Sequence, residues 1–210
     1  MAKPVHPTYK NKDGKRIPSV TTILGVLNKP ALVYWANNLG LQGINTKDYV
    51  DNLADIGTLA HSMCEEYLTS EKLDKADYTQ EQIDIAKICL LKFYEWVNIN
   101  NPTECKCEIL LSSQERQFAG TCDLYCTING KKVLVDFKTC KAIYPEMKTQ
   151  VVAYKDLLEE NGYIVDECRI LRIGRSEEEG FEEVIVDKEE LHRERFIACH
   201  KIYLLNKELK

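Results

Sequence analysis

The pair Asn129-Gly130 constrains the fold of this chain more than any other feature, because it lies between two runs of β-branched and apolar residues. Asn-Gly favours a two-residue turn between antiparallel strands, since both positions of such a turn need a positive φ. A loop of these two residues pairs Ile128 with Lys131 and fixes the register of the strands on either side. The sequence therefore predicts a β-hairpin whose cross-strand neighbours are counted outward from its turn.

This register brings two carboxylates to one face of the hairpin. Asp123 is expected opposite Asp136, and Thr121 opposite Lys138. Side chains directly opposite each other have Cβ atoms about 5 Å apart, and like charges placed so are destabilising unless something compensates. A divalent cation is one compensation, and Lys138 shares its face with Asp136 because the side chains of a strand alternate. The arrangement is typical of phosphodiester cleavage; the alternative is an ordinary Asp-x-Lys on a solvated strand face.

Two helical segments on either side of the hairpin each carry a polar pair at four-residue spacing. His61 and Glu65 lie one turn apart in the first segment, where they either bind a metal or hydrogen-bond to each other. Pro145 opens the second segment, in which Gln150 and Tyr154 are expected to point the same way. Such pairs are also common on ordinary helix surfaces, so neither pair identifies a site by itself.

The order of these motifs along the chain resembles the PD-(D/E)XK nuclease superfamily, in particular its RecB-like exonuclease branch. The motifs are, in order, His61, Glu108, Gly120-x-x-Asp123, Asp136-x-Lys138 and Gln150-x-x-x-Tyr154. The N-terminal segments 18–27 and 32–36 also resemble the lead-in of phage and prophage members. The resemblance covers about residues 17 to 175.

The resemblance implies a metal site that uses Mg²⁺ or Mn²⁺. Asp123 and Asp136 would be metal-binding carboxylates, joined by the backbone carbonyl of Phe137 and by His61 as a further ligand. Lys138 would orient or deprotonate the attacking water. Hard cations of this kind prefer carboxylate oxygens, and they place positive charge where a phosphodiester accumulates negative charge.

The resemblance also assigns roles outside the metal ligands. Gln150 and Tyr154 would hold the DNA strand or the scissile phosphate. Glu108 fits an acidic position that precedes the Gly-x-x-Asp motif in many relatives, although an edge-strand glutamate paired to a lysine explains it almost as well. Glu108 and Glu65 are therefore accessory candidates.

The function implied is a metal-dependent DNA exonuclease that serves phage-type recombination or DNA processing. The alternative is a DNA-end-binding or partner-recruiting module on the same fold, with catalysis lost or subordinated. A single-strand annealing protein or a helicase is the partner expected beside DNA, and the oligomeric state is open. A site-specific endonuclease would need base-reading elements, for which little of the chain is left.

Length and composition indicate one domain in a reducing compartment. The 210 residues suffice for one domain over 1–210, with a helical lead-in (1–100), a nuclease core (105–187) and a C-terminal helix (188–210). No apolar run reaches membrane-spanning length and the N-terminus has no apolar signal region, so a cytoplasmic location is expected.

The nine cysteines are expected to be reduced thiols. Cys89, Cys122 and Cys126 occupy positions of small core residues. No iron-sulfur cluster is expected, because only Cys168 and Cys199 follow the core. A zinc site that uses Cys105 and Cys107 with Cys122 and Cys126 is the less favoured reading, since no Cys-x-x-Cys knuckle is present.

The net charge of −5 requires a local basic surface if the chain binds DNA. The residues expected to form that surface are Lys138, Lys141, Lys148 and Lys155.

The pattern of apolar residues predicts an α/β fold, a central mixed β-sheet flanked by helices as in the restriction-endonuclease-like core. Trp35 and Trp96 are expected to pack beneath the N-terminal helices. Helices are expected over residues 20–39, 48–69 and 79–99, from Pro145 and from Lys188, and strands over residues 107–112, 121–128, 133–138, 168–173 and 182–186.

Overall fold

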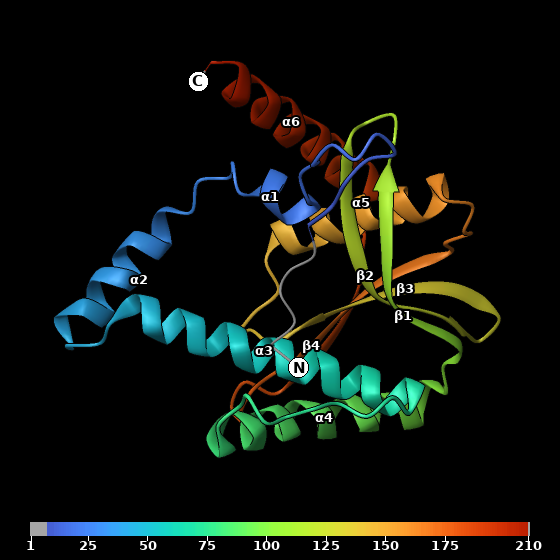
Figure 1. Ribbon diagram of the computed structural model, residues 1–210. Helices are drawn as coiled ribbons and strands as arrows, with labels where there is room; N and C mark the ends of the chain where they lie inside the picture. Colours follow the sequence, from blue (N-terminus) through green and yellow to red (C-terminus); the bar gives the residue numbers. More distant parts are fainter. Residues whose placement is uncertain (1–7, 210) are drawn as a thin grey trace.

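The computed structural model describes residues 8–209, and within them the strands form one five-stranded sheet (Figure 1). The neighbouring strands are antiparallel except β3 and β4, which run parallel because the helix α5 crosses over between them. This confirms the predicted α/β fold with a central mixed sheet, and it is consistent with a restriction-endonuclease-like core. In spatial order the strands are β1 (Thr103–Ser113), β2 (Phe118–Ile128), β3 (Lys131–Lys138), β4 (Glu167–Ile173) and β5 (Phe181–Ile185).

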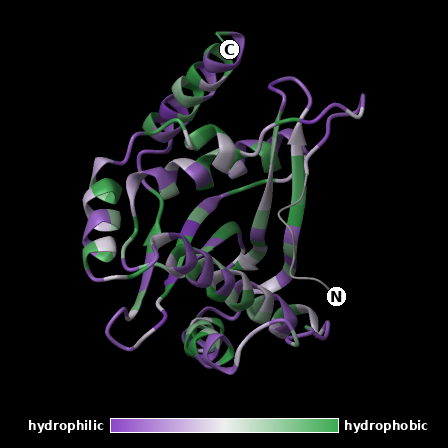
Figure 2. Ribbon diagram, turned by 60° about the vertical axis from the view of Figure 1, so that its left-hand side comes forward, coloured by the Kyte–Doolittle hydropathy of each residue, from purple (hydrophilic) through white to green (hydrophobic). Residues whose placement is uncertain are grey.

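Helices cover both faces of the sheet. The helices are α1 (Val20–Leu24), α2 (Pro30–Leu41), α3 (Thr46–Thr69), α4 (Gln80–Asn100), α5 (Pro145–Glu160) and α6 (Glu189–Glu208). Val133 and Val135 of β3 pack with α3 and α4, whereas Leu134 between them packs with α1, α5 and α6. This alternation along β3 divides the core into two clusters, one on each face. Figure 2 shows the hydrophobic residues on the strands and on the helices that pack against them.

The turn at Asn129-Gly130 has the predicted conformation, with φ of 50° and 78°. The pairs of β2 with β3 run from Ile128–Lys131 to Leu124–Val135, which confirms the register counted from the turn. The recorded pairs end one step before the two aspartates.

The expected pairs Asp123–Asp136 and Thr121–Lys138 lie beyond Leu124–Val135, the last pair of β2 with β3, and stay a prediction. On their other sides Thr121 pairs with Leu110 of β1, and Lys138 pairs with Arg172 of β4. Each of these inner strands has two neighbours in the sheet, so these partners do not exclude the expected pairing.

The single helix expected over residues 20–39 is wrong, because α1 ends at Leu24 and α2 begins at Pro30. Proline has no amide hydrogen and disfavours a helical conformation in the residue before it. Lys29 accordingly has φ −122° and ψ 74°.

The two tryptophans differ in burial, so the expectation for Trp35 is wrong. Trp96 is 2% exposed in the core, whereas Trp35 on α2 is 37% exposed. The ring of Trp35 packs against Tyr49, with ring centroids 6.0 Å apart. Within residues 30–41 of α2 no side chain is buried, so this helix lies at the margin of the fold.

Two remaining sequence predictions concern the cysteines and the extent of the domain. Cys89, Cys122 and Cys126 are buried free thiols, as predicted. None of the described helices is both long and apolar enough to cross a membrane. The single domain over 1–210 stays a prediction.

Candidate active site

Three side chains from three different elements converge beside the hairpin. His61 of α3, Glu108 of β1 and Asp123 of β2 each offer one potential ligand atom, and these atoms lie within 4.8 Å of one another. Two carboxylates and an imidazole form a donor set that suits a divalent cation. The sequence predicted His61 and Asp123 as ligands and Glu108 only as an accessory residue.

His61 reaches this position because α3 passes very close to the end of β3. A Cβ atom at Gly57 would lie 2.9 Å from Oγ1 of Thr139, so the glycine permits the approach. His61 is one turn further along α3, and its ring meets that of Phe137 edge-on, with centroids 5.6 Å apart. The glycine thus helps to place the imidazole beside the sheet.

His61 and Asp123 form a charged pair. Nδ1 of His61 lies 3.6 Å from Oδ1 of Asp123, whose other oxygen accepts a hydrogen bond of 2.7 Å from the backbone N–H of Phe137. Burial lowers the pKa of His61, but the charge of Asp123, its hydrogen bond and the charge of Asp136 together outweigh burial, and the pKa is raised. Burial raises the pKa of Asp123, but the charges of His61 and Lys138 outweigh it and the pKa is lowered. Each group therefore stabilises the ionised form of the other.

Glu108 lies on the edge strand with an unusual backbone conformation. Its φ is 48°, a region that non-glycine residues seldom adopt and that often marks a functional site. The residue is exposed as a whole, yet protein atoms crowd its carboxyl group. Burial of the carboxyl group, together with the negative charge of Asp123, raises the pKa of Glu108 to about 7. Glu65 adds to this effect through its own negative charge, but it is outside the group of three.

Asp136 is the most deeply buried carboxylate of the site, with its side chain 1% exposed. Within residues 8–209 neither of its oxygens has a hydrogen-bond partner, although Nζ of Lys138 lies 2.6 Å from Oδ2. This pair is thus held by charge and not by an aligned hydrogen bond. Burial raises the pKa of Asp136 to about 6, against the opposing charge of Lys138. Burial lowers the pKa of Lys138, but the charges of Asp136 and Asp123 outweigh it and the pKa is raised.

The buried oxygens of Asp136, which make no hydrogen bond within residues 8–209, fit a cation. A buried polar atom without a partner costs free energy, and native structures usually supply a partner or an ion. The oxygens belong to the predicted catalytic carboxylate, which is outside the three-residue group formed by His61, Glu108 and Asp123 but close enough for its charge to raise the pKa of His61. A hard divalent ion is therefore compatible with the residues present. Of Phe137 the structure shows the amide bonded to Asp123; a ligand role for its carbonyl stays a prediction.

Gln150 and Tyr154 point together, as the spacing on α5 predicted. Nε2 of Gln150 donates a hydrogen bond of 2.9 Å to the hydroxyl of Tyr154. Burial, together with the negative charges of Asp136 and Asp123, raises the pKa of Tyr154 well above its usual value. The phenol therefore lies within electrostatic reach of both carboxylates.

Sequence reasoning missed Tyr9. Its hydroxyl shares a hydrogen bond of 2.9 Å with Oγ1 of Thr121, two residues before Asp123 on β2. Burial raises the pKa of Tyr9, and the charge of Glu108 adds to the rise. No local signal links residues separated by 112 positions, although Thr121 shares a strand face with Asp123.

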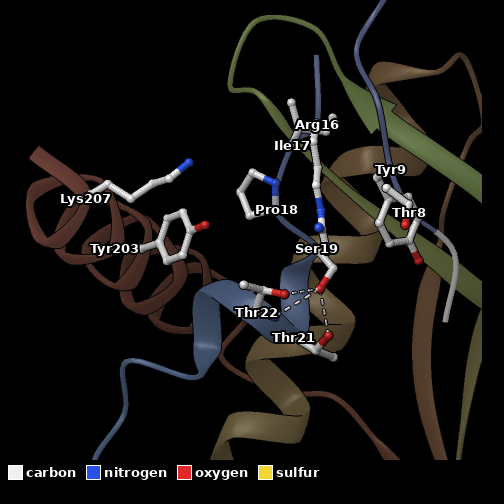
Figure 3. Close-up of a pocket in the computed structure, with 10 residues that line it drawn as sticks. All are labelled: Thr8, Tyr9, Arg16, Ile17, Pro18, Ser19, Thr21, Thr22, Tyr203 and Lys207. Atoms are coloured by element: carbon white, nitrogen blue, oxygen red, sulfur yellow. Dashed lines mark hydrogen bonds between the residues drawn. The ribbon is translucent and has the colours of Figure 1, made fainter. Parts of the chain in front are cut away.

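Tyr9 also borders a hollow of about 480 Å³ on the side of the site toward α6. Arg16 and Lys207 lie on its walls, with the hydroxyl of Ser19 bonded to those of Thr21 and Thr22 below them (Figure 3). This is a polar, cationic surface close to the carboxylates.

The predicted basic surface differs from the observed one. Lys148 and Lys155 form ion pairs of 2.7 Å with Asp187 and Glu189 near the start of α6. The positive charges of these two lysines are thus balanced by the carboxylates of Asp187 and Glu189. Lys138 is the member of the predicted cluster that contacts the candidate catalytic residues.

Comparisons with known proteins give only remote likenesses. No family model and no curated protein matches the sequence. Three solved structures are similar to this chain over part of its length. A candidate exonuclease from Eubacterium rectale is 14% identical with a TM-score of 0.46, covering 71% of this chain and 68% of the other. An alkaline exonuclease from Laribacter hongkongensis is 10% identical with a TM-score of 0.37, covering 72% and 83%.

The third structure, that of the protein SSO0001, is 14% identical with a TM-score of 0.36 and covers 69% of this chain and 84% of the other. All three TM-scores are below 0.5, so none of these likenesses assigns a role to a residue of this chain.

Proposed function

We propose that this chain is a metal-dependent deoxyribonuclease that hydrolyses phosphodiester bonds from the ends of DNA strands. The observation that carries the proposal is the Asp136 carboxylate, which is buried, makes no hydrogen bond within residues 8–209 and has Nζ of Lys138 2.6 Å from Oδ2. A purely structural ion pair gains from hydrogen bonds to its buried oxygens, and Asp136 has none within residues 8–209. A bound cation would give these oxygens a second partner beside Lys138.

In this proposal the acidic residues and the histidine of the site would bind the metal ion. Asp123, Asp136 and His61 would hold Mg²⁺ or Mn²⁺, with the Phe137 carbonyl and the carboxylate of Glu108 as further ligands. The cation would supply positive charge for the negative charge that develops on the phosphate.

Lys138 would hold the attacking water at Nζ and stabilise the same developing charge. Gln150 and Tyr154, joined by their hydrogen bond of 2.9 Å, would position the strand.

The choice of strand ends as the substrate rests on the resemblance of the motif order to the RecB-like branch. That resemblance also supports a role in phage-type recombination or DNA processing in the cytoplasm, with an annealing protein or a helicase as partner. The cationic walls of Arg16 and Lys207 fit an anionic strand that passes the site.

The test uses one pair of substrates. Linear end-labelled DNA and covalently closed circles of the same sequence are incubated with the protein in Mg²⁺, in Mn²⁺ and in a chelator. We expect metal-dependent degradation of the linear DNA and survival of the circles. Cleavage of the circles would identify an endonuclease instead. A gel shift of DNA without cleavage in either metal would identify a binding module.

A further inference from the structure

A second hollow, of about 680 Å³, opens from the candidate site toward α2. Its floor is formed by Lys138 and Gln150, which also belong to the candidate site. Its walls come from the end of α1, the loop that follows it, the start of α2 and the start of α5. Whatever binds at Lys138 therefore has this space immediately beside it.

The walls of the hollow are largely apolar. They include Leu24 and Leu27 on one side and Met147 on α5, with Leu32 of α2 at the mouth. Leu32 is 52% exposed, so an apolar residue borders the open side of the hollow. Apolar walls around a few polar groups are the usual composition of a site for a small organic group, and volumes of about 300–1,000 Å³ are common for such sites.

An ion pair links the start of α2 to the start of α5, which form two walls of the hollow. Nζ of Lys29, at the start of α2, lies 2.7 Å from Oε1 of Glu146 at the start of α5. Leu32 and Met147 follow these two residues by three positions and by one, so the pair sets how far apart the apolar walls stand. The hollow is thus built by contacts of the fold and not only by a gap between helices.

We propose that this hollow receives the unpaired base of the nucleotide next to the scissile phosphate, so that the substrate is single-stranded DNA. The inference rests on the proposed nuclease function. A phosphate held at Lys138 carries its own nucleoside into the neighbouring space, and a base offers flat apolar faces to Leu27, Leu32 and Met147. A base enclosed in this way is separated from a complementary strand, and unpairing costs least when the strand is already single. The apolar walls would contact the flat faces that all four bases share, so this contact does not select one base.

The first experiment measures cleavage. The double variant Leu32→Ala/Met147→Ala is compared with the wild type on a single strand and on the same strand in a blunt duplex, in Mn²⁺. The control is Val33→Ala, the next residue of α2, which is 69% exposed and does not line the hollow. We expect the wild type to cleave the single strand in preference to the duplex. The double variant should have a KM for the single strand about tenfold higher, with little change in kcat, and the control should match the wild type.

Removal of the base from the substrate is the counterpart of removing the apolar side chains from the protein. A single strand with an abasic position at the nucleotide next to the cleaved bond has nothing to place in the hollow. Wild type and the double variant should then cleave it with the same KM, because removal of either partner has already removed the contact.

The second experiment does not depend on turnover. Asp136→Asn is combined with Leu32→Ala/Met147→Ala, and binding of a labelled single strand is followed by fluorescence anisotropy in Ca²⁺. The triple variant should bind about tenfold more weakly than Asp136→Asn alone, while the abasic strand should bind equally to both.

Three results would overturn the inference. The first is faster cleavage of the blunt duplex than of the single strand, and the second is an equal KM of the double variant and Val33→Ala for the intact strand. The third is a change of oligomeric state in the double variant without loss of strand binding. Failure of the proposed nuclease function looks different, since no DNA would be cleaved in either metal, and the anisotropy comparison would still decide whether the hollow holds a base.

Discussion

Gly120 and Tyr154 lie so close together that a Cβ atom at position 120 would be 2.5 Å from Cε1 of the tyrosine ring. The contact joins β2, which carries Asp123, to α5, which carries Gln150. Because the ring is 6% exposed and packed on all sides, it has little room to yield. The glycine of the Gly-x-x-Asp motif is thus needed for the approach of a helix.

The first prediction concerns this contact. Gly120→Ala should destabilise the protein by about 1–3 kcal/mol, the usual cost of overpacking, and should lower activity by moving Tyr154. Thermal unfolding and cleavage of a labelled single strand measure the two effects. Gly40→Ala is the control, since a Cβ there meets nothing within 4 Å. Equal unfolding curves for wild type and Gly120→Ala would show that α5 adapts freely.

The second prediction separates the two members of the Asp136–Lys138 pair. Asp136→Asn and Lys138→Ala should each reduce cleavage by about 10²-fold or more. Calorimetric titration with Mn²⁺ should show a large loss of metal affinity in Asp136→Asn and a small one in Lys138→Ala, because only the carboxylate is a ligand. Unchanged hydrolysis in either variant would refute the site.

The third prediction distinguishes a metal ligand from a core histidine at His61. His61→Ala should weaken Mn²⁺ binding and reduce cleavage, with little change in the melting temperature of the metal-free protein. Its side chain is 27% exposed, so it is not a fully buried core residue. The opposite pattern, with a clearly lower melting temperature and normal Mn²⁺ binding, would make the histidine structural.

The fourth prediction is a pH dependence remote from the site. Burial raises the pKa of Glu167, but hydrogen bonds from Lys131 and Arg169 outweigh it and the pKa is lowered. The unfolded chain therefore binds this proton more readily, so the stabilisation is present above the usual pKa of 4.5 and is lost as the pH falls through the folded-state pKa. Glu167→Gln should lower the melting temperature at pH 7 by about 2 °C, a difference that disappears in strong acid. Glu178→Gln, an exposed loop residue, is the control.

The elements that could be predicted from the sequence are those whose structure depends on neighbouring residues. The Asn129-Gly130 turn sets the hairpin register through short-range geometry, and Pro145 marks the start of α5, which carries Gln150. The break before Pro30 was missed because the apolar pattern continues across it.

Residues that join the site over long distances were also missed. The hydroxyl of Tyr9 meets Thr121 across 112 positions, and no periodicity records such a contact. Glu108 was predicted only as an accessory residue for a related reason, since its place beside Asp123 depends on the pairing of β1 with β2 and on a positive φ within the strand.

The last prediction tests whether the hydroxyl of Tyr154 positions the strand. Tyr154→Phe keeps the ring against Gly120 but removes the group that accepts the 2.9 Å hydrogen bond from Gln150. We expect slower cleavage of linear DNA, unchanged Mn²⁺ affinity and no rescue by excess Mn²⁺, because the hydroxyl orients substrate and not metal. Tyr125→Phe is the matched control, since it removes a hydroxyl with a 2.7 Å bond to the carbonyl of Ile164 outside the candidate site. Full restoration of the Tyr154→Phe rate by excess Mn²⁺ would instead assign the hydroxyl to the metal site.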